Sequence, residues 1–170
     1  TEQWETLRQN RIDDLQVYLA LARFRKRPPF SRLPQWLPRD IREFFRRYKK
    51  ACQAADELLF AAGNVEAVDA ACQKSKLGRL TSNALCVHKS ALSGLDSILR
   101  VYEGCARAYL GEIDDANIVK IHRFSRKVSY LACPDFDKHP HPAIQRIVKL
   151  SMGSLNLECH DHSENDNPAV

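Results

Sequence analysis

The side chains best suited to chemistry gather in one short segment, Cys133-Pro-Asp-Phe-Asp-Lys-His-Pro-His-Pro142. Potential metal ligands occupy alternate positions there, which would place them on one face of an extended chain: Cys133, Asp135, Asp137, His139 and His141. Carboxylates and imidazoles suit zinc or manganese. The interspersed prolines favour polyproline II instead, where the period of three removes the shared face. The segment is therefore a metal or catalytic site, a partner contact, or a rigid structural loop whose carboxylates bond the local backbone.

The second candidate is the basic segment, Arg23 to Lys50, which holds eleven of the 26 Lys and Arg residues against only Asp40 and Glu43. The whole chain carries a net charge of only +5, so the positive charge is concentrated in this part. Aromatic residues are interspersed along it. Such a composition predicts contact with a polyanion, most often nucleic acid. The alternative is a charged surface that only keeps the domain in solution.

A helical wheel refines this prediction for the second half of the basic segment. Pro38 is expected to open a helix that runs to Ala62 and ends at Gly63. At about 100° per residue, one arc of this helix should face the core: Ile41, Phe44, Phe45, Tyr48, Cys52, Ala55 and Leu59. A neighbouring arc is basic, and only Arg47 falls outside it. The predicted phosphate contacts, including three upstream residues, are Arg25, Lys26, Arg27, Arg39, Arg42, Arg46, Lys49 and Lys50. Binding through them would depend strongly on salt.

Other reactive residues point to structure more than to catalysis. His88 lies in an apolar stretch that we predict to be helical, where it would be a satisfied helix residue. Glu103 and Arg107 form a favourable i,i+4 helix pair, which could be a structural tie or a site. No glycine-rich nucleotide motif or nucleophile motif is present, so we predict no cofactor. The six cysteines lack zinc-finger spacing and are expected to be reduced thiols.

The elements that must position these residues change in character along the chain. Helices are predicted at 11–27, ended by Pro28-Pro29, at 65–75, and at 81–111 with a division at Ser93-Gly94. After Gly111 the apolar period becomes two. Strands are predicted at 118–124, 128–132, 144–150 and 155–159, with turns at Ser125-Arg126 and 152–154. This order predicts an α+β fold: an N-terminal helical layer of about five helices, followed by a small antiparallel sheet.

We predict one domain over 1–170, with a helical part at 11–111, a β part at 117–160 and a loose acidic tail at 161–170. No apolar run is long enough for a membrane span, so no membrane association is expected. The opening residues do not form a signal peptide, which predicts a cytoplasmic protein. Because the sequence begins at Thr1, it suggests a fragment or a processed product.

Several segments, in this order, resemble the C-terminal region of the DNA phosphorothioation-associated methyltransferase family. They are DLQVYLALARFRKRPPFSRLP, DIREFFRRYKKACQAADELLF, LTSNALCVHKSALSGLDSILRVYEGCARAYLGEI, KVSYLACPDFDKHPHPAI and the HSENDNP tail. The resemblance extends from about Asp14 to near the end of the chain. It implies a bacterial, cytosolic protein linked to sulfur modification of the DNA backbone and to bacterial defence.

The resemblance does not imply methyl transfer by this chain. The methyltransferase segment of that family, with its cofactor loop, lies N-terminal to the matched region. The family pattern has Tyr at the positions of Cys86 and Cys133 and an acidic residue at His139. Three residues match the pattern, so a metal-dependent nuclease or hydrolase would be centred on Asp135, Asp137 and His141.

The leading hypothesis is a non-catalytic accessory domain that binds DNA, or RNA, through the phosphate contacts of the basic segment. It would deliver substrate to, or dock with, a methyltransferase or a sulfur-modification partner. The first alternative is the metal-dependent nuclease or hydrolase. The second is a protein-interaction module in which the basic and aromatic residues dock an acidic partner.

Overall fold

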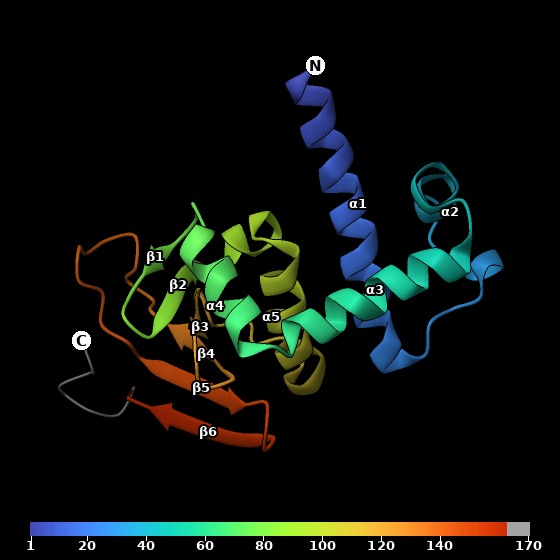
Figure 1. Ribbon diagram of the computed structural model, residues 1–170. Coiled ribbons are helices and arrows are strands. Elements are labelled where there is room, and N and C mark those ends of the chain that lie inside the picture. Colours follow the sequence, from blue (N-terminus) through green and yellow to red (C-terminus); the bar gives the residue numbers. More distant parts are fainter. Residues whose placement is uncertain (163–170) are drawn as a thin grey trace.

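Helices form the first part of the chain and a six-stranded antiparallel sheet most of the remainder (Figure 1), in a computed structural model that describes residues 1–162. The helices are α1 (Glu2–Ala22), α2 (Leu37–Asp40), α3 (Tyr48–Ala62), α4 (Val65–Lys74) and α5 (Ser97–Leu110). Short helical segments of other types are η1 (Arg23–Arg25), η2 (Phe30–Arg32), η3 (Ile41–Phe45) and η4 (Lys89–Gly94). The predicted α+β class is confirmed.

The six strands lie side by side in the order of the sequence, and each neighbouring pair is antiparallel. They are β1 (Arg79–Leu80), β2 (Ala84–His88), β3 (Ile118–His122), β4 (Lys127–Ala132), β5 (Arg146–Ser151) and β6 (Asn156–Asp161). The predicted turns between β3 and β4 and between β5 and β6 are confirmed. Positive φ angles at Arg126 and Leu155 reverse the chain without the glycine that such turns favour.

The prediction of a helix from residue 81 to Ser93 is wrong, because the chain forms β2 there and His88 is the last residue of this strand. The predicted helical part therefore contains two strands. Pairing decides the structure: β2 aligns with β3 along its whole length and buries Leu85 and Val87. A run of five residues fits a helical or a strand period equally well, so a distant partner strand determines which forms.

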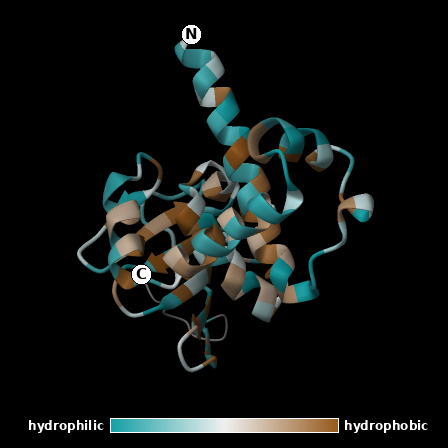
Figure 2. Ribbon diagram, turned by 45° about the vertical axis from the view of Figure 1, so that its right-hand side comes forward, coloured by the Kyte–Doolittle hydropathy of each residue, from teal (hydrophilic) through white to brown (hydrophobic). Residues whose placement is uncertain are grey.

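Helix α1 begins well before the predicted start at residue 11. Its first turns project from the body of the molecule and are mainly hydrophilic (Figures 1 and 2). Residues 1–11 are all exposed, so this part has no apolar stripe from which the helical period could be recognised. The C-terminal half of α1 supplies Leu15 and Leu19 to the core, where both are fully buried.

The core lies where α1, α3 and α5 pack together and where the helices meet one face of the sheet (Figure 2). Leu99 of α5, Ile121 of β3 and Leu150 of β5 are fully buried there. Helices α1 and α5 approach closely at Gly104. A Cβ atom at this position would lie 2.6 Å from Cδ1 of Leu21, so only glycine fits without a shift.

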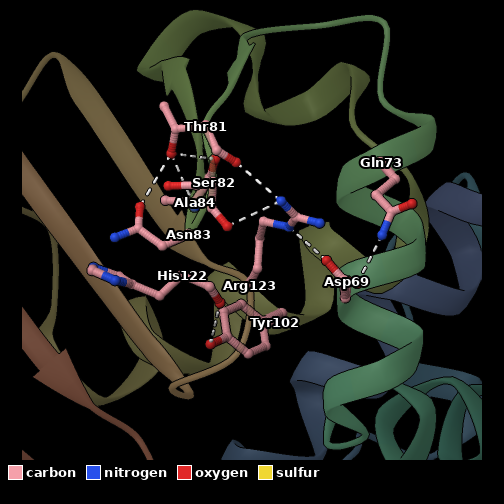
Figure 3. A network of polar contacts seen from close by, with 9 residues as sticks. All are labelled: Asp69, Gln73, Thr81, Ser82, Asn83, Ala84, Tyr102, His122 and Arg123. Carbon is pink, nitrogen blue, oxygen red and sulfur yellow. Dashed lines mark hydrogen bonds and ion pairs between the residues drawn. The ribbon is translucent and has the colours of Figure 1, made fainter.

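Ion pairs between distant segments fasten these elements. The Arg123 guanidinium donates to the Asp69 carboxylate of α4 at 2.6 Å and to the Thr81 carbonyl at 3.0 Å (Figure 3). Arg100 of α5 donates to Asp14 of α1 at 2.8 Å. These contacts hold α4 against the sheet and α1 against α5.

Glu103 is the one buried acid of α5, with only 1% of its surface exposed. Its carboxylate accepts a hydrogen bond from the Tyr130 hydroxyl at 2.9 Å and one from the Arg107 guanidinium at 3.0 Å. Burial raises the pKa of Glu103, and the positive charge of Arg107 partly offsets that effect. The predicted Glu103–Arg107 pair is confirmed, and Tyr130 links it to the sheet.

None of the helices in the described part of the chain is long and apolar enough to cross a membrane. Strand β6 runs to Asp161, the first residue of the predicted loose tail, which lies opposite Arg146 of β5. Residues 163–170 of that tail lie outside the described residues.

Candidate nucleic-acid interface

The centre of the basic segment is a bend, where a straight helix from Pro38 to Ala62 had been predicted. Helix α2 continues into the π-helical η3, and α3 begins only at Tyr48. Between them Arg46 adopts φ 63° and ψ −39°, and the Arg47 amide donates to the Phe45 carbonyl at 2.7 Å. This is a γ-turn with positive φ, a rare and strained conformation for a residue with a side chain.

Packing explains why the predicted single helix is wrong. A straight helix would point all its aromatic residues at one surface. The bend separates them: the Phe44 ring lies under the guanidinium groups of Arg8 and Arg11, at 5.7 and 5.9 Å, whereas Phe45 and Tyr48 pack against the core. The adjacent residues Phe44 and Phe45 therefore have different neighbours, whereas a single straight helix would place both on one face.

The bend also rearranges the predicted basic stripe. We call the exposed cations around it the basic corner: Arg39, Arg42, Arg46, Arg47, Lys49 and Lys50. Within residues 1–162 none of them forms an ion pair with a carboxylate. The nearby acid Asp40 is buried and accepts two hydrogen bonds from Arg11 of α1, so it does not neutralise the corner. Glu43 is the remaining exposed acid of this stretch.

A loop from the first half of the basic segment is fastened to the corner. The Tyr48 hydroxyl donates to the Pro28 carbonyl at 2.7 Å, and burial raises the pKa of Tyr48 to about 12, which keeps this donor protonated. The Phe30 ring lies 5.9 Å from the Tyr48 ring and 5.3 Å from the Arg42 guanidinium. The exposed Arg32, at the end of η2, follows directly.

Arg25 and Lys26, at the end of η1, are exposed and line a groove of about 400 Å³. The groove lies between the end of α1 and α5, and Arg107 and Glu112 line its other side. These two predicted contacts therefore flank a different surface from the basic corner, although they belong to the same segment.

Arg27 has a structural role. Its side chain is only 15% exposed, and its guanidinium donates to the Asp56 carboxylate at 2.6 Å and to the Leu19 carbonyl at 2.7 Å. Arg23 also contacts Asp56, at 2.8 Å. These bonds tie the end of α1 to α3, so Arg27 is not available to a ligand and we leave it out of the interface.

Sequence reasoning passed over two exposed cations of this region. Arg47 falls outside the basic arc of a straight helical wheel, but after the bend its side chain is exposed, like that of the neighbouring Arg46. Arg32 lies between the helices predicted at 11–27 and from Pro38 to Ala62, so it belongs to neither helical wheel. The count of charges over the basic segment was the only sequence signal that included both residues.

The alternative site, residues 133–142, is a loop between β4 and β5 at the end of the molecule opposite the basic segment (Figure 1). The Asp135 carbonyl accepts from the amides of Lys138 and His139, at 3.0 and 3.2 Å, and the Asp135 carboxylate pairs with Lys138 at 3.3 Å. In the described residues, no three His, Cys, Asp or Glu side chains group as metal ligands would, and Asp135, Asp137 and His141 do not converge. The loop is held by local backbone contacts.

Comparisons of the chain with models of known families, with curated proteins and with solved structures find no match. The resemblance to the DNA phosphorothioation-associated family therefore stays a prediction.

Proposed function

We propose that this protein is a non-catalytic accessory domain of the cytoplasm that binds nucleic acid through phosphate contacts of the basic corner. The observation that carries the proposal is the gathering of six exposed cations, without carboxylate partners in the described residues, around a strained bend. Backbone strain of this kind is retained where the surrounding structure enforces it and is frequent at functional sites, as are π-helical turns.

The chemistry of the corner favours backbone recognition. Arginine guanidinium and lysine ammonium groups bind phosphate oxygens regardless of base identity, so they position a nucleic acid without reading its sequence. The aromatic residues of the basic segment that pack inward, Phe45 and Tyr48, are not free to stack on bases. The preference for DNA, and for docking beside a methyltransferase or a sulfur-modification protein, comes from the family resemblance.

The test is a triple substitution, Arg42→Gln, Arg46→Gln and Lys49→Gln, measured by fluorescence anisotropy on duplex DNA and duplex RNA over a series of salt concentrations. Each lost phosphate contact reduces the slope of log affinity against log salt by about 0.9 on DNA. We therefore expect a slope flatter by about 2 to 3 and a similar loss of affinity on unrelated sequences.

The matched control carries the same loss of charge elsewhere, Lys74→Gln, Lys76→Gln and Lys138→Gln, at three exposed positions outside the basic segment. It should keep the wild-type slope. If the control and the corner variant lose affinity equally, only net charge matters and the interface is elsewhere. Unchanged binding by the corner variant would refute the proposal.

A further inference from the structure

A second group of cations lies on the face of the sheet that points away from α4 and α5. The register aligns Lys120 of β3, Ser129 of β4 and Lys149 of β5 in one row across the three strands. His122 belongs to the same face, since its Nε2 atom lies 2.9 Å from the Ser129 hydroxyl. Figure 3 shows the His122 ring on one side of the sheet and the Arg123 side chain, the next residue, directed to the other side at Asp69. Lys127, at the start of β4, also lies next to His122.

The positive charges of these lysines have few carboxylate partners in the part of the chain that the structure describes. Within the described residues, the one carboxylate that pairs with these lysines is Glu158 of β6, 3.6 Å from Lys149. Lys120 and Lys127 pair with no carboxylate within residues 1–162. Burial lowers the pKa of His122 to about 4, and the charges of Lys120, Lys149 and Lys127 contribute further. The imidazole is therefore neutral near pH 7, and three ammonium groups surround an uncharged polar pair.

A catalytic role for the Ser129–His122 pair does not fit this geometry. Ser129 is only 2% exposed, so a substrate cannot reach its hydroxyl. Within the described residues, no carboxylate bonds the second ring nitrogen of His122, as a serine nucleophile would require for its base. The Ser129–His122 pair is a polar, uncharged part of the sheet surface next to the lysine side chains.

We propose that the outer face of the sheet binds a phosphate-bearing anion between Lys120, Lys127 and Lys149, above the His122–Ser129 pair. Lys120 and Lys149 lie two strands apart, about 9 to 10 Å between backbones, and their flexible side chains can converge on one or two phosphate groups. Lysine ammonium groups bind phosphate as point charges without a fixed angle. A bound phosphate would offset the mutual repulsion of the three ammonium groups. This site is separate from the basic corner, because it belongs to strands and not to the basic segment.

The experiment measures the pKa of His122 from the pH dependence of its imidazole NMR signals, during a titration of the protein with inorganic pyrophosphate at constant ionic strength. In the described part of the chain, the charged groups facing His122 are the three lysines, with Glu158 beyond Lys149. A bound anion cancels much of the lysine field, so the pKa of His122 should rise by about one unit. The signals of His141, in the exposed loop 133–142, provide the internal reference and should not move.

The double variant Lys120→Gln, Lys149→Gln should lose the response to pyrophosphate, whereas the control Lys74→Gln, Lys76→Gln should keep it. The basic-corner triple variant should also keep the response to pyrophosphate. Each of the two proposals can therefore be refuted without affecting the other. Equal responses of His122 and His141, or an unchanged response in the Lys120→Gln, Lys149→Gln variant, would overturn the site.

The ligand source is resolved by repeating the titration with ADP and with a 5′-phosphorylated oligonucleotide. Equal affinity for pyrophosphate and ADP would assign the site to the phosphate groups alone. Tighter binding of ADP would assign it to a nucleotide, and tighter binding of the oligonucleotide to a nucleic-acid end. If none of the three ligands moves the His122 signals at millimolar concentration, the proposal is wrong.

Discussion

Arg27 and Arg46 belong to the same basic segment, yet their surroundings in the fold are opposite. Arg27 lies at the junction of α1 and α3, where a carboxylate and backbone carbonyls accept its hydrogen bonds. Arg46 lies at the bend before α3, exposed and in a strained backbone conformation. One junction uses positive charge to join helices, and the other presents it to solvent.

The difference shows what a count of charges leaves undecided. A buried guanidinium is retained because removing it would leave its acceptors unsatisfied. An exposed guanidinium on strained backbone contributes nothing comparable to folding, so its position needs another explanation. Substitutions of enclosed charges and of exposed charges should therefore change stability in opposite directions, and four predictions test that contrast.

The largest effect is expected where a charge is most enclosed, at Glu103. Glu103→Ala leaves the Tyr130 hydroxyl and the Arg107 guanidinium without their acceptor, and it opens a cavity in α5. We expect a loss of about 3 kcal/mol in the free energy of unfolding, measured by urea denaturation. Glu103→Gln keeps an acceptor in place and should cost much less. Equal losses in the two variants would mean that the hydrogen bonds are not what stabilises this site.

A smaller loss in the free energy of unfolding is expected when the Arg27–Asp56 contact is removed. Arg27→Ala should cost about 2 kcal/mol, because a charge-assisted hydrogen bond to a carboxylate is lost. DNA binding at matched temperature should hardly change. A variant that folds as well as wild type but loses DNA affinity would move Arg27 back to the interface.

The same junction should respond to pH. The hydrogen bond from Arg27, helped by Arg23, holds the pKa of Asp56 below its ordinary value of 3.8. The unfolded chain therefore binds this proton at higher pH than the folded one. The stabilisation is complete above about pH 5 and is lost as the pH falls through the lowered pKa. The stability difference between wild type and Asp56→Asn should accordingly shrink on acidification below pH 4.

The smallest effect is expected at the bend, and it has the opposite sign. Arg46→Gly removes the side chain that makes a positive φ costly, so stability should rise by about 0.5–1 kcal/mol. DNA affinity should fall and the salt slope should flatten by about one. Arg46→Lys retains the charge and provides the control for binding. A loss of stability in Arg46→Gly would show that the backbone at this position is not strained.

The sequence predicted the elements whose signals are local. The apolar period of two after Gly111 was enough to predict strands β3 to β6. The i,i+4 spacing was enough to predict the Glu103–Arg107 pair. The bend at Arg46 could not be foreseen, because no glycine or proline marks it and the residues of α1 that contact Phe44 beside it are distant in the sequence. Strand β2 was missed for a similar reason, because its partner β3 lies about 30 residues further along the chain.

In the candidate sites too, local features could be predicted from the sequence and features set by distant contacts could not. The charge count found the basic segment, but it could not show that Arg27 pairs with Asp56 of α3. The lysines of the outer sheet face carried no signal at all, since Lys120, Lys127 and Lys149 are far apart in sequence and only strand register brings them together.

The sequential order of the strands has a consequence for the rate of folding. Strands β3 to β6 are joined by direct antiparallel connections, so each new strand can add to its predecessor along the chain. Only β2 must wait for a partner across an inserted helix, α5. Contacts between close neighbours in sequence form quickly because little chain entropy is lost in closing them. The C-terminal meander can therefore assemble first and serve as the surface on which α5, and then α1, dock.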